Sequence, residues 1–285
     1  MSASTGPVAR VGAARGSSRV TPTVALRPRA AAGALLLMLL LLACRPSPVG
    51  AASSAGAASP RSGAVRVQVM VAGRSGVVLE PPHGVLAAAA HVRLTGHGCA
   101  VAAGTPLAVL VALRHAGGPG FTLRDYGHCD ASPADSAQLF VTSIGGQRNG
   151  GQNGWEYKVN GRAGSTGAAD PSGPLGNGRR LPAGAQVLWF YCQMSTAGCQ
   201  RTLRVVPHGS SVAPGAPLPV SVSGYDDEGR AAPVAGAAVT LGPSTASSLG
   251  GGVATLTAPA APGRYELSAS APGMAPPFPA AVQVR

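Results

Sequence analysis

The sequence predicts two folded domains, an α+β domain over residues 64–206 and a small all-β sandwich within residues 207–285, of which residues 207–214 are a linker. Three observations lead to this prediction. Alternating apolar residues in the first region favour strands, and residues 105–119 contain the start and stop signals of a single helix. Short apolar runs separated by glycine and proline recur through the second region, which is typical of a β-sandwich.

Composition excludes several classes of protein. The 285 residues include 41 glycines and 26 prolines, whereas charged residues make up only 11% and aromatic residues only 4%. These values exclude a coiled coil, a long-helix bundle and a charge-driven disordered protein. Lys158 is the one lysine, and the other basic residues are all arginine. Together with the abundant alanine and glycine, this bias indicates a GC-rich bacterial genome.

Residues 1–43 have the pattern of an export signal. Arginines without any acidic residue precede the apolar run at residues 34–43, which is too short to span a membrane and fits a signal peptide. Residues 1–43 contain five of the 22 basic residues and none of the ten acidic ones, so the formal charge falls from +12 to +7 without them. We therefore expect an extracellular protein that does not bind nucleic acid, and attraction to anionic wall polymers or lipid head groups remains open.

The string Leu41-Leu42-Ala43-Cys44 at the end of this run resembles a bacterial lipobox. In such signals the cysteine becomes the first mature residue and bears lipid, so the resemblance implies lipidation of Cys44 and anchoring to the outer face of the cell membrane. The alternative is ordinary cleavage near residues 49–51 and free secretion. Residues 44–63 are rich in Pro, Ser, Ala and Gly and lack apolar periodicity, which predicts a disordered linker.

The four remaining cysteines predict two disulfides. An even number of cysteines in an exported chain favours disulfides, and three pairings are possible. We favour Cys99–Cys129 and Cys192–Cys199, and the second of these closes a short loop after an aromatic strand.

No motif in the sequence matches the pattern of a known catalytic or metal site. The strings His97-Gly98-Cys99 and His128-Cys129-Asp130 offer metal-ligand types, but the chain has no Cys-x-x-Cys or His-Glu-x-x-His spacing, so we expect no metal. The glycine-rich segment 145–154 lacks the Lys-Ser/Thr of a phosphate loop, and there is no Gly-x-Ser-x-Gly elbow. Residues 226–228 are acidic, and we interpret them as a solvated turn rather than a calcium site. We therefore expect no catalytic residues and no enzymatic activity.

The expected elements follow from local patterns. Thr105 is a good N-cap with Pro106 at the first helical position, although a strand over residues 107–113 competes with this helix. Asn160-Gly161 predicts a hairpin turn. In the first domain we expect strands at residues 65–71, 91–95, 139–144, 155–159, 187–192 and 202–206. In the second we expect them at residues 218–223, 239–241, 251–256, 263–270 and 281–284.

The string Trp155-x-Tyr157-x-Val159-Asn160-Gly161, followed by Val187-Leu188-Trp189, resembles a bacterial family of domains of unknown function. That family is related to the transcobalamin C-terminal domain, and the resemblance covers residues 104–192. It implies an α+β, ubiquitin-grasp-like fold. It also implies candidate ligand contacts at Trp155, Tyr157, Asn160 and Trp189 and cobalamin as a candidate ligand, although the helical barrel beside this domain in transcobalamin is missing. For the aromatic residues, core and cross-strand packing is the alternative.

The spacing Val234-x-Gly236-Ala237-x-Val239, with Gly263-Arg264-Tyr265 downstream, resembles bacterial immunoglobulin-like or carboxypeptidase-regulatory-like domains. This resemblance implies a stalk or adhesion module. We thus expect a lipid-anchored, non-enzymatic surface protein that binds or displays through loops 145–154 and 163–184. Its partner would be a wall polymer or another surface protein, and the basic residues around these loops are Arg148, Lys158, Arg162, Arg179 and Arg180. The alternatives are a cobalamin-like capture lipoprotein and, third, a hydrolase.

Overall fold

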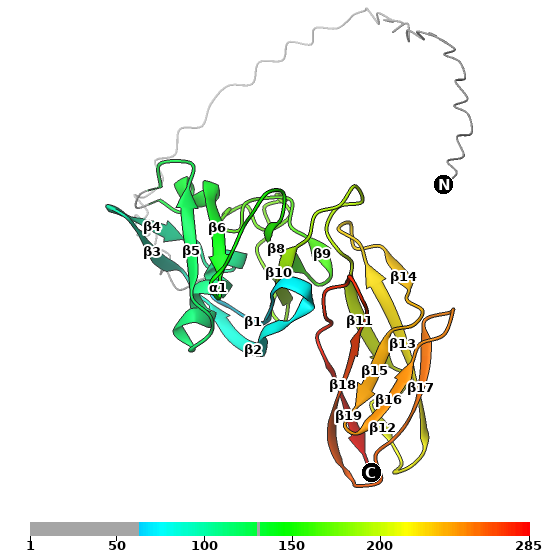
Figure 1. The fold of residues 1–285 in the computed structure, drawn as a ribbon. Coiled ribbons are helices and arrows are strands. Elements are labelled where there is room, and N and C mark those ends of the chain that lie inside the picture. Colours follow the sequence, from blue (N-terminus) through cyan, green and yellow to red (C-terminus); the bar gives the residue numbers. More distant parts are fainter. Residues whose placement is uncertain (1–62, 130–131) are drawn as a thin grey trace, which may run out of the picture. The chain divides into compact units, whose positions relative to one another are not determined.

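The computed structural model describes residues 63–129 and 132–285 (Figure 1). The predicted signal peptide, Cys44 and nearly all of the predicted linker lie outside the described residues, as does Asp130. Among the described residues, no helix has both the length and the apolar character that crossing a membrane requires.

A five-stranded sheet is built around the parallel strands β1 and β10. In β1, Val67, Val69 and Val71 lie in the first hydrophobic core, whereas Met70 and Ala72 lie in a separate buried cluster on the other face. Both faces of the central strands are therefore covered, as is usual for parallel pairs. The sheet order is β2 (Val78–Ala87), β1 (Val65–Ala72), β10 (Gln186–Cys192), β8 (Gly154–Val159) and β9 (Arg162–Ala163).

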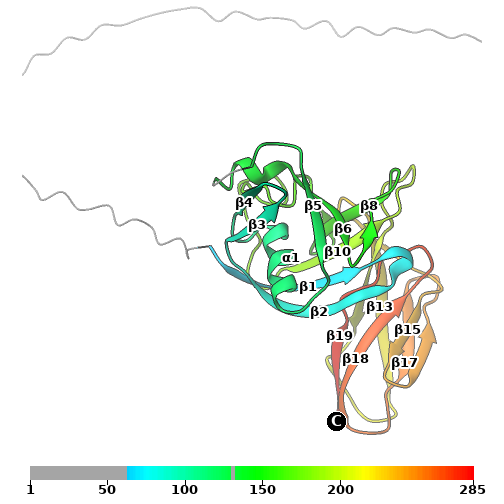
Figure 2. The same cartoon turned by 60° about the vertical axis from the view of Figure 1, so that its left-hand side comes forward.

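One α-helix, α1 (Pro106–His115), contacts β1 and β2 (Figure 2). The Thr105 hydroxyl accepts a hydrogen bond from the Ala108 N–H at 3.3 Å, which satisfies one of the free donors of the first turn. Gly117 has φ +96°, and the Gly118 N–H donates to the Leu113 carbonyl, so glycine ends the helix. The helix predicted at this position is confirmed, and the competing strand is absent.

Most of the first region is nevertheless β structure, and the α+β, ubiquitin-grasp-like fold class is wrong. About 48% of the described residues are in strands and 8% are helical, with α1 the one α-helix among them. Glycine and proline stop helices and favour short strands joined by turns, so a single ten-residue helix remains. The additional elements are β3 (Ala90–Leu94) with β4 (His97–Val101), the sheet β5 (Phe121–Asp125), β6 (Leu139–Ile144) and β7 (Gln147–Arg148), and two 3-10 turns, Arg74–Gly76 and Asp135–Gln138.

The sequence patterns did not reveal β2, which contains Pro81 and Pro82. Proline cannot donate a ladder hydrogen bond, so consecutive prolines argue against a strand unless it lies at an edge. β2 is the outer strand of its sheet, and its register with β1 shifts between Val69 and Val71, beside the prolines. The edge position therefore accommodates them.

Residues 202–285 form a two-sheet β-sandwich around one core, as expected for this region from the sequence. The strand β11, expected to close the first domain, instead pairs with β13, and its Leu203 and Val205 belong to the sandwich core. One sheet contains β11 (Thr202–Pro207), β13 (Pro217–Tyr225), β14 (Ala231–Pro233) and β17 (Val253–Thr257). The other contains β12 (Ser211–Val212), β19 (Ala280–Val284), β18 (Gly263–Ser270), β15 (Ala238–Leu241) and β16 (Ser244–Ser247).

Candidate functional site

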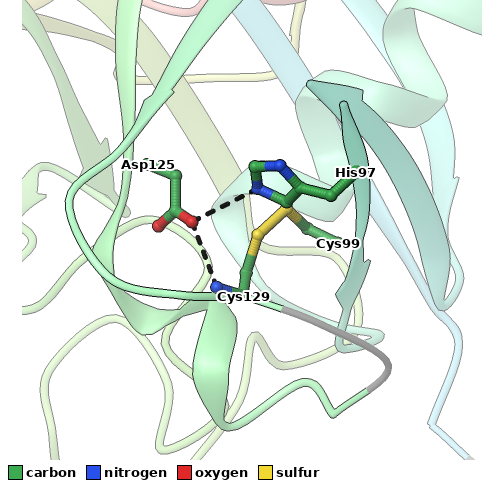
Figure 3. A group of neighbouring side chains, drawn as sticks. All are labelled: His97, Cys99, Asp125 and Cys129. Carbon is green, nitrogen blue, oxygen red and sulfur yellow. Dashed lines mark hydrogen bonds and ion pairs between the residues drawn. A yellow bond between two sulfur atoms is a disulfide. The ribbon is translucent and has the colours of Figure 1, made fainter. Parts of the chain in front are cut away.

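The first candidate site surrounds the disulfide between Cys99 and Cys129 (Figure 3). His97 and Cys99 come from β4, Asp125 is the last residue of β5, and Cys129 lies in the loop that follows. Their four potential ligand atoms lie within 4.8 Å of one another. Both sulfur-bearing residues are buried, whereas the His97 side chain is 44% exposed.

Asp125 organises the loop that brings Cys129 back to β4. Its carboxylate accepts hydrogen bonds from the N–H groups of Gly127 at 2.9 Å and Cys129 at 3.0 Å, which forms a side-chain-stabilised turn. Nε2 of His97 lies 3.5 Å from Oδ2 of Asp125. The Cys129 N–H lowers the pKa of the Asp125 carboxyl most, with smaller contributions from Gly127 and His97, while partial burial acts in the opposite direction.

The chemistry open to this cluster is set by its disulfide. With both sulfurs bonded to each other, His97 and Asp125 are the two donors left for a metal, fewer than the four ligands of a structural zinc site. The cluster thus acts as a staple between β4 and the loop after β5, and Asp125 and His97 hold it in place. Of the residues weighed for a metal, His128 lies outside this group, and sequence reasoning missed Asp125 because it stands four residues before Cys129 in no known ligand spacing.

The second disulfide, Cys192–Cys199, joins the end of β10 to the segment before β11. The structure therefore contains both pairs that the sequence favoured. The Cys199 N–H donates to the Asp227 carboxylate at 3.1 Å, which links this disulfide loop to the turn between β13 and β14.

Three of the four candidate ligand contacts are buried in the first core. Trp155, Tyr157 and Trp189 are each at most 5% exposed. Trp155 meets Tyr191 edge-on at 5.7 Å, and Tyr157 lies 5.5 Å from Trp189, measured between ring centroids. The Tyr157 hydroxyl donates to the Thr166 carbonyl at 2.9 Å, and burial raises the pKa of Tyr157 to about 12, so it remains a neutral donor. These contacts are those of core side chains.

Trp189 retains one feature that packing does not explain. Its buried indole N–H has no hydrogen-bond partner among the described residues, and the ring borders a small cavity of about 80 Å³. That volume is far below the size of a cofactor site. Cobalamin therefore stays a prediction for this chain.

The fourth candidate, Asn160, forms the predicted hairpin turn between β8 and β9. Asn160 and Gly161 both have positive φ, +50° and +87°, as the tightest hairpin turn requires. The Asn160 side-chain oxygen accepts from the Gln186 N–H, and the Asn160 N–H donates to the Gln186 carbonyl, both at 2.9 Å. Asn160 thereby fixes the turn against β10.

A cavity of about 490 Å³ lies beside Asn160, within the size range of small-molecule sites. Its lining includes Gln186, Arg204, Tyr225 and Phe278. Arg204 donates to the Tyr225 hydroxyl at 3.3 Å, so polar groups at the wall are already ordered. Sequence reasoning missed these residues because they belong to separate segments and to no motif.

The basic residues around the loops are not equivalent. Arg148, Arg162, Arg179 and Arg180 are exposed, as an anionic partner would need. Lys158 has no exposed surface, so unlike these four arginines it does not present its charge to a partner at the surface.

Comparison with known proteins gives a partial match. Residues 110–172 match a family described as a domain of unknown function, DUF4430. A similar solved structure is the D00-D0 domain of intimin, with 16% identity over 52% of this chain and 90% of that chain, at a TM-score of 0.26. No curated protein matches the chain significantly. The predicted resemblance to a family of domains of unknown function is thus confirmed, whereas a relation to transcobalamin is not shown.

Proposed function

We propose that this chain is a bacterial surface protein that is exported, lipid-anchored at Cys44 and used for non-enzymatic binding or display. The observation that carries the proposal is the state of the cysteines. All four cysteines among the described residues pair into two disulfides, which persist in oxidising compartments outside the cytosol. The fifth is Cys44, the lipobox residue, which stands outside the described residues directly after the apolar run.

The architecture supports a binding or display role. A β-sandwich forms the C-terminal region, and the disulfides join β4 to the loop after β5 and the end of β10 to the segment before β11. The cavity beside Asn160 and the exposed arginines give two different surfaces to a partner. Binding residues are often placed on loops above such rigid scaffolds.

Cell fractionation tests export and anchoring together. Cells producing the full chain should yield it in the membrane fraction, accessible to protease added outside, and a Cys44→Ser variant should appear in the medium. The variant Ser47→Ala, three residues farther along, is the matched control and should stay with the membrane. Recovery of the unprocessed chain in the cytosol would overturn the proposal.

Mass spectrometry without reductant tests the disulfide part. The exported protein should be lighter than its fully reduced form by four hydrogens, two for each disulfide. Free thiols at Cys99 and Cys129 in protein taken from the cell surface would contradict the structure on which the proposal rests.

A further inference from the structure

The single lysine of the chain occupies an unusual place. Every other basic side chain is arginine, yet Lys158 on β8 has none of its surface exposed. It faces the side of the sheet that also buries Leu188 and Phe190, and Leu188 is its partner across β10. Lysine is among the residues least often buried, so a side chain that is both the only lysine and fully buried calls for a reason.

The amine of Lys158 lies against the carboxyl group of Asp227. Nζ is 3.0 Å from Oδ1 of Asp227 and 3.4 Å from the carbonyl oxygens of Tyr225 and Asp226. Oδ1 is itself buried and has no other partner among the described residues. The amine and the carboxyl are therefore in direct contact.

Two further hydrogen bonds hold Asp227, one at its carboxyl and one at its backbone. Its Oδ2 accepts the Cys199 N–H at 3.1 Å, and Cys199 is tied by its disulfide to Cys192 at the end of β10. The Asp227 backbone carbonyl accepts the Ala163 N–H at 2.9 Å. A backbone N–H on Oδ2 is placed to stabilise negative charge on that oxygen if the carboxyl carbon is attacked.

An aromatic ring and a second carboxyl lie near the pair. The Phe190 ring centroid lies 5.4 Å from Nζ. Glu156 stands two residues before Lys158 on the same face of β8, opposite Phe190. Although part of this residue is exposed, loss of solvent around its carboxyl raises the pKa of Glu156, and the negative charge of Asp227 raises it further. Glu156 is thus a carboxyl on the same face of β8 as Lys158, and it holds its proton more readily than a free glutamate does.

We propose that Lys158 and Asp227 condense into an amide cross-link between their side chains, with Glu156 as the proton relay. The ammonium of Lys158 loses one proton to a carboxylate, and the free amine attacks Cγ of Asp227. The tetrahedral intermediate places its oxyanion on Oδ2, beside the Cys199 N–H. Proton transfer through Glu156 then lets Oδ1 leave as water. An ammonium and a carboxylate give one amide and one water, so no oxidant, reductant or further reactant is needed.

This reaction explains why lysine stands at a position where the chain elsewhere uses arginine. The guanidinium of arginine stays charged and is a poor nucleophile, whereas a lysine amine that loses its proton is reactive. The cross-link would join β8 to the turn between β13 and β14, a connection that neither disulfide makes. The proposal does not depend on export or on lipid at Cys44.

Tryptic peptide mapping of the full chain, reduced and denatured, gives the direct test. Trypsin cleaves after arginine and unmodified lysine, so a cross-linked Lys158 would resist cleavage. We expect one species in which peptide 149–162 is joined to peptide 205–230, lighter by one water than the sum of the two. This readout is unaffected by processing at the N-terminus. Recovery of peptide 149–158 and a free peptide 205–230 from the folded protein would overturn the proposal.

Variants distinguish this chemistry from an ordinary ion pair. Lys158→Arg keeps the positive charge but should abolish the linked species, and Asp227→Ala should do the same. Asp226→Ala is the matched control, because the Asp226 side chain accepts the Arg230 N–H and not the lysine, and it should retain the link. Glu156→Gln should slow formation of the link at least tenfold during refolding. Unchanged linking kinetics in Glu156→Gln would refute the relay role, and loss of the link in Asp226→Ala would refute the assignment to Asp227.

Discussion

The first hydrophobic core and the sandwich core consist of different kinds of residue. The first contains the aromatic residues Trp155, Tyr157 and Trp189 and the disulfide Cys99–Cys129. The sandwich core is made of valine, leucine and alanine, and none of its buried residues is aromatic or cysteine. Long glycine-rich connections at residues 145–154 and 163–184 interrupt the strands around the first core. The second core is instead formed by apolar residues that alternate regularly along its strands. Large rings and a cross-link thus compensate where strand regularity is interrupted.

Removing the disulfide of the first core should produce the largest loss. The double variant Cys99→Ala, Cys129→Ala removes a cross-link between residues that are 30 positions apart in the sequence. We expect the free energy of unfolding to fall by about 3–4 kcal/mol. The matched double variant at Cys192 and Cys199 removes a cross-link between residues seven positions apart, and we expect it to lower the free energy of unfolding by about 2–3 kcal/mol. Urea unfolding followed by Trp fluorescence measures both. Equal losses would show that loop length does not determine the contribution.

A large-to-small substitution should damage the sandwich core without any cross-link being involved. Leu267 is fully buried on β18, so Leu267→Ala should lower the free energy of unfolding by about 3 kcal/mol. Hydrogen exchange should show the loss of protection in β15 and β18. Leu249→Ala is the control, because Leu249 is 73% exposed and its loss should have little effect. If the two variants lost stability equally, the assignment of the second core would be wrong.

Loss of the helix cap should produce a smaller effect confined to the first region. Thr105→Ala removes the hydroxyl that accepts the Ala108 N–H and donates to the Ala102 carbonyl at 2.8 Å, and we expect a cost of about 1 kcal/mol. Thr105→Ser retains both bonds and should be close to the parent in a thermal melt. A serine variant as unstable as the alanine variant would assign the effect to methyl packing instead.

The smallest effect is the pH dependence of the Asp125 turn. Because folding lowers the pKa of Asp125, its contribution to stability is complete above the ordinary aspartate pKa and is lost as the pH falls through the lower folded value. Urea midpoints measured between pH 5 and about pH 2 should fall less steeply for Asp125→Asn than for the parent. Identical pH profiles would show that the Asp125 hydrogen bonds do not contribute.

Local signals predicted local structure well, and long-range pairing much less well. The N-cap at Thr105 and the Asn160-Gly161 turn depend on neighbouring residues, and both are where the sequence placed them. By contrast, β11 has a strand pattern that any sheet could accept, and the pairing with β13 is decided by packing of Leu203 and Val205. The fold class was wrong for a related reason, since a short strand such as β5 becomes part of a sheet only through a partner farther along the chain, here β6.

The features of the candidate sites divide in the same way into local ones, which the sequence predicted, and long-range ones, which it did not. Cysteine number and spacing indicated the disulfides, but the role of Asp125 and the Lys158–Asp227 contact could be found only in the three-dimensional structure. Lys158 alternates correctly for a solvent-facing residue of β8, but this face of the sheet is buried and the carbonyls of Tyr225 and Asp226 contact its amine.

The two prolines at the margin of the first sheet also affect how copies of the protein meet. An unpaired outer strand offers a row of amide hydrogens to which another chain can add. Successive N–H groups of a strand point to opposite edges, so one of Pro81 and Pro82 removes a donor from that row of β2, and the shifted register interrupts the remainder. Concentrated protein should therefore resist fibre growth along this side, and replacing both prolines with threonine would open it to self-assembly.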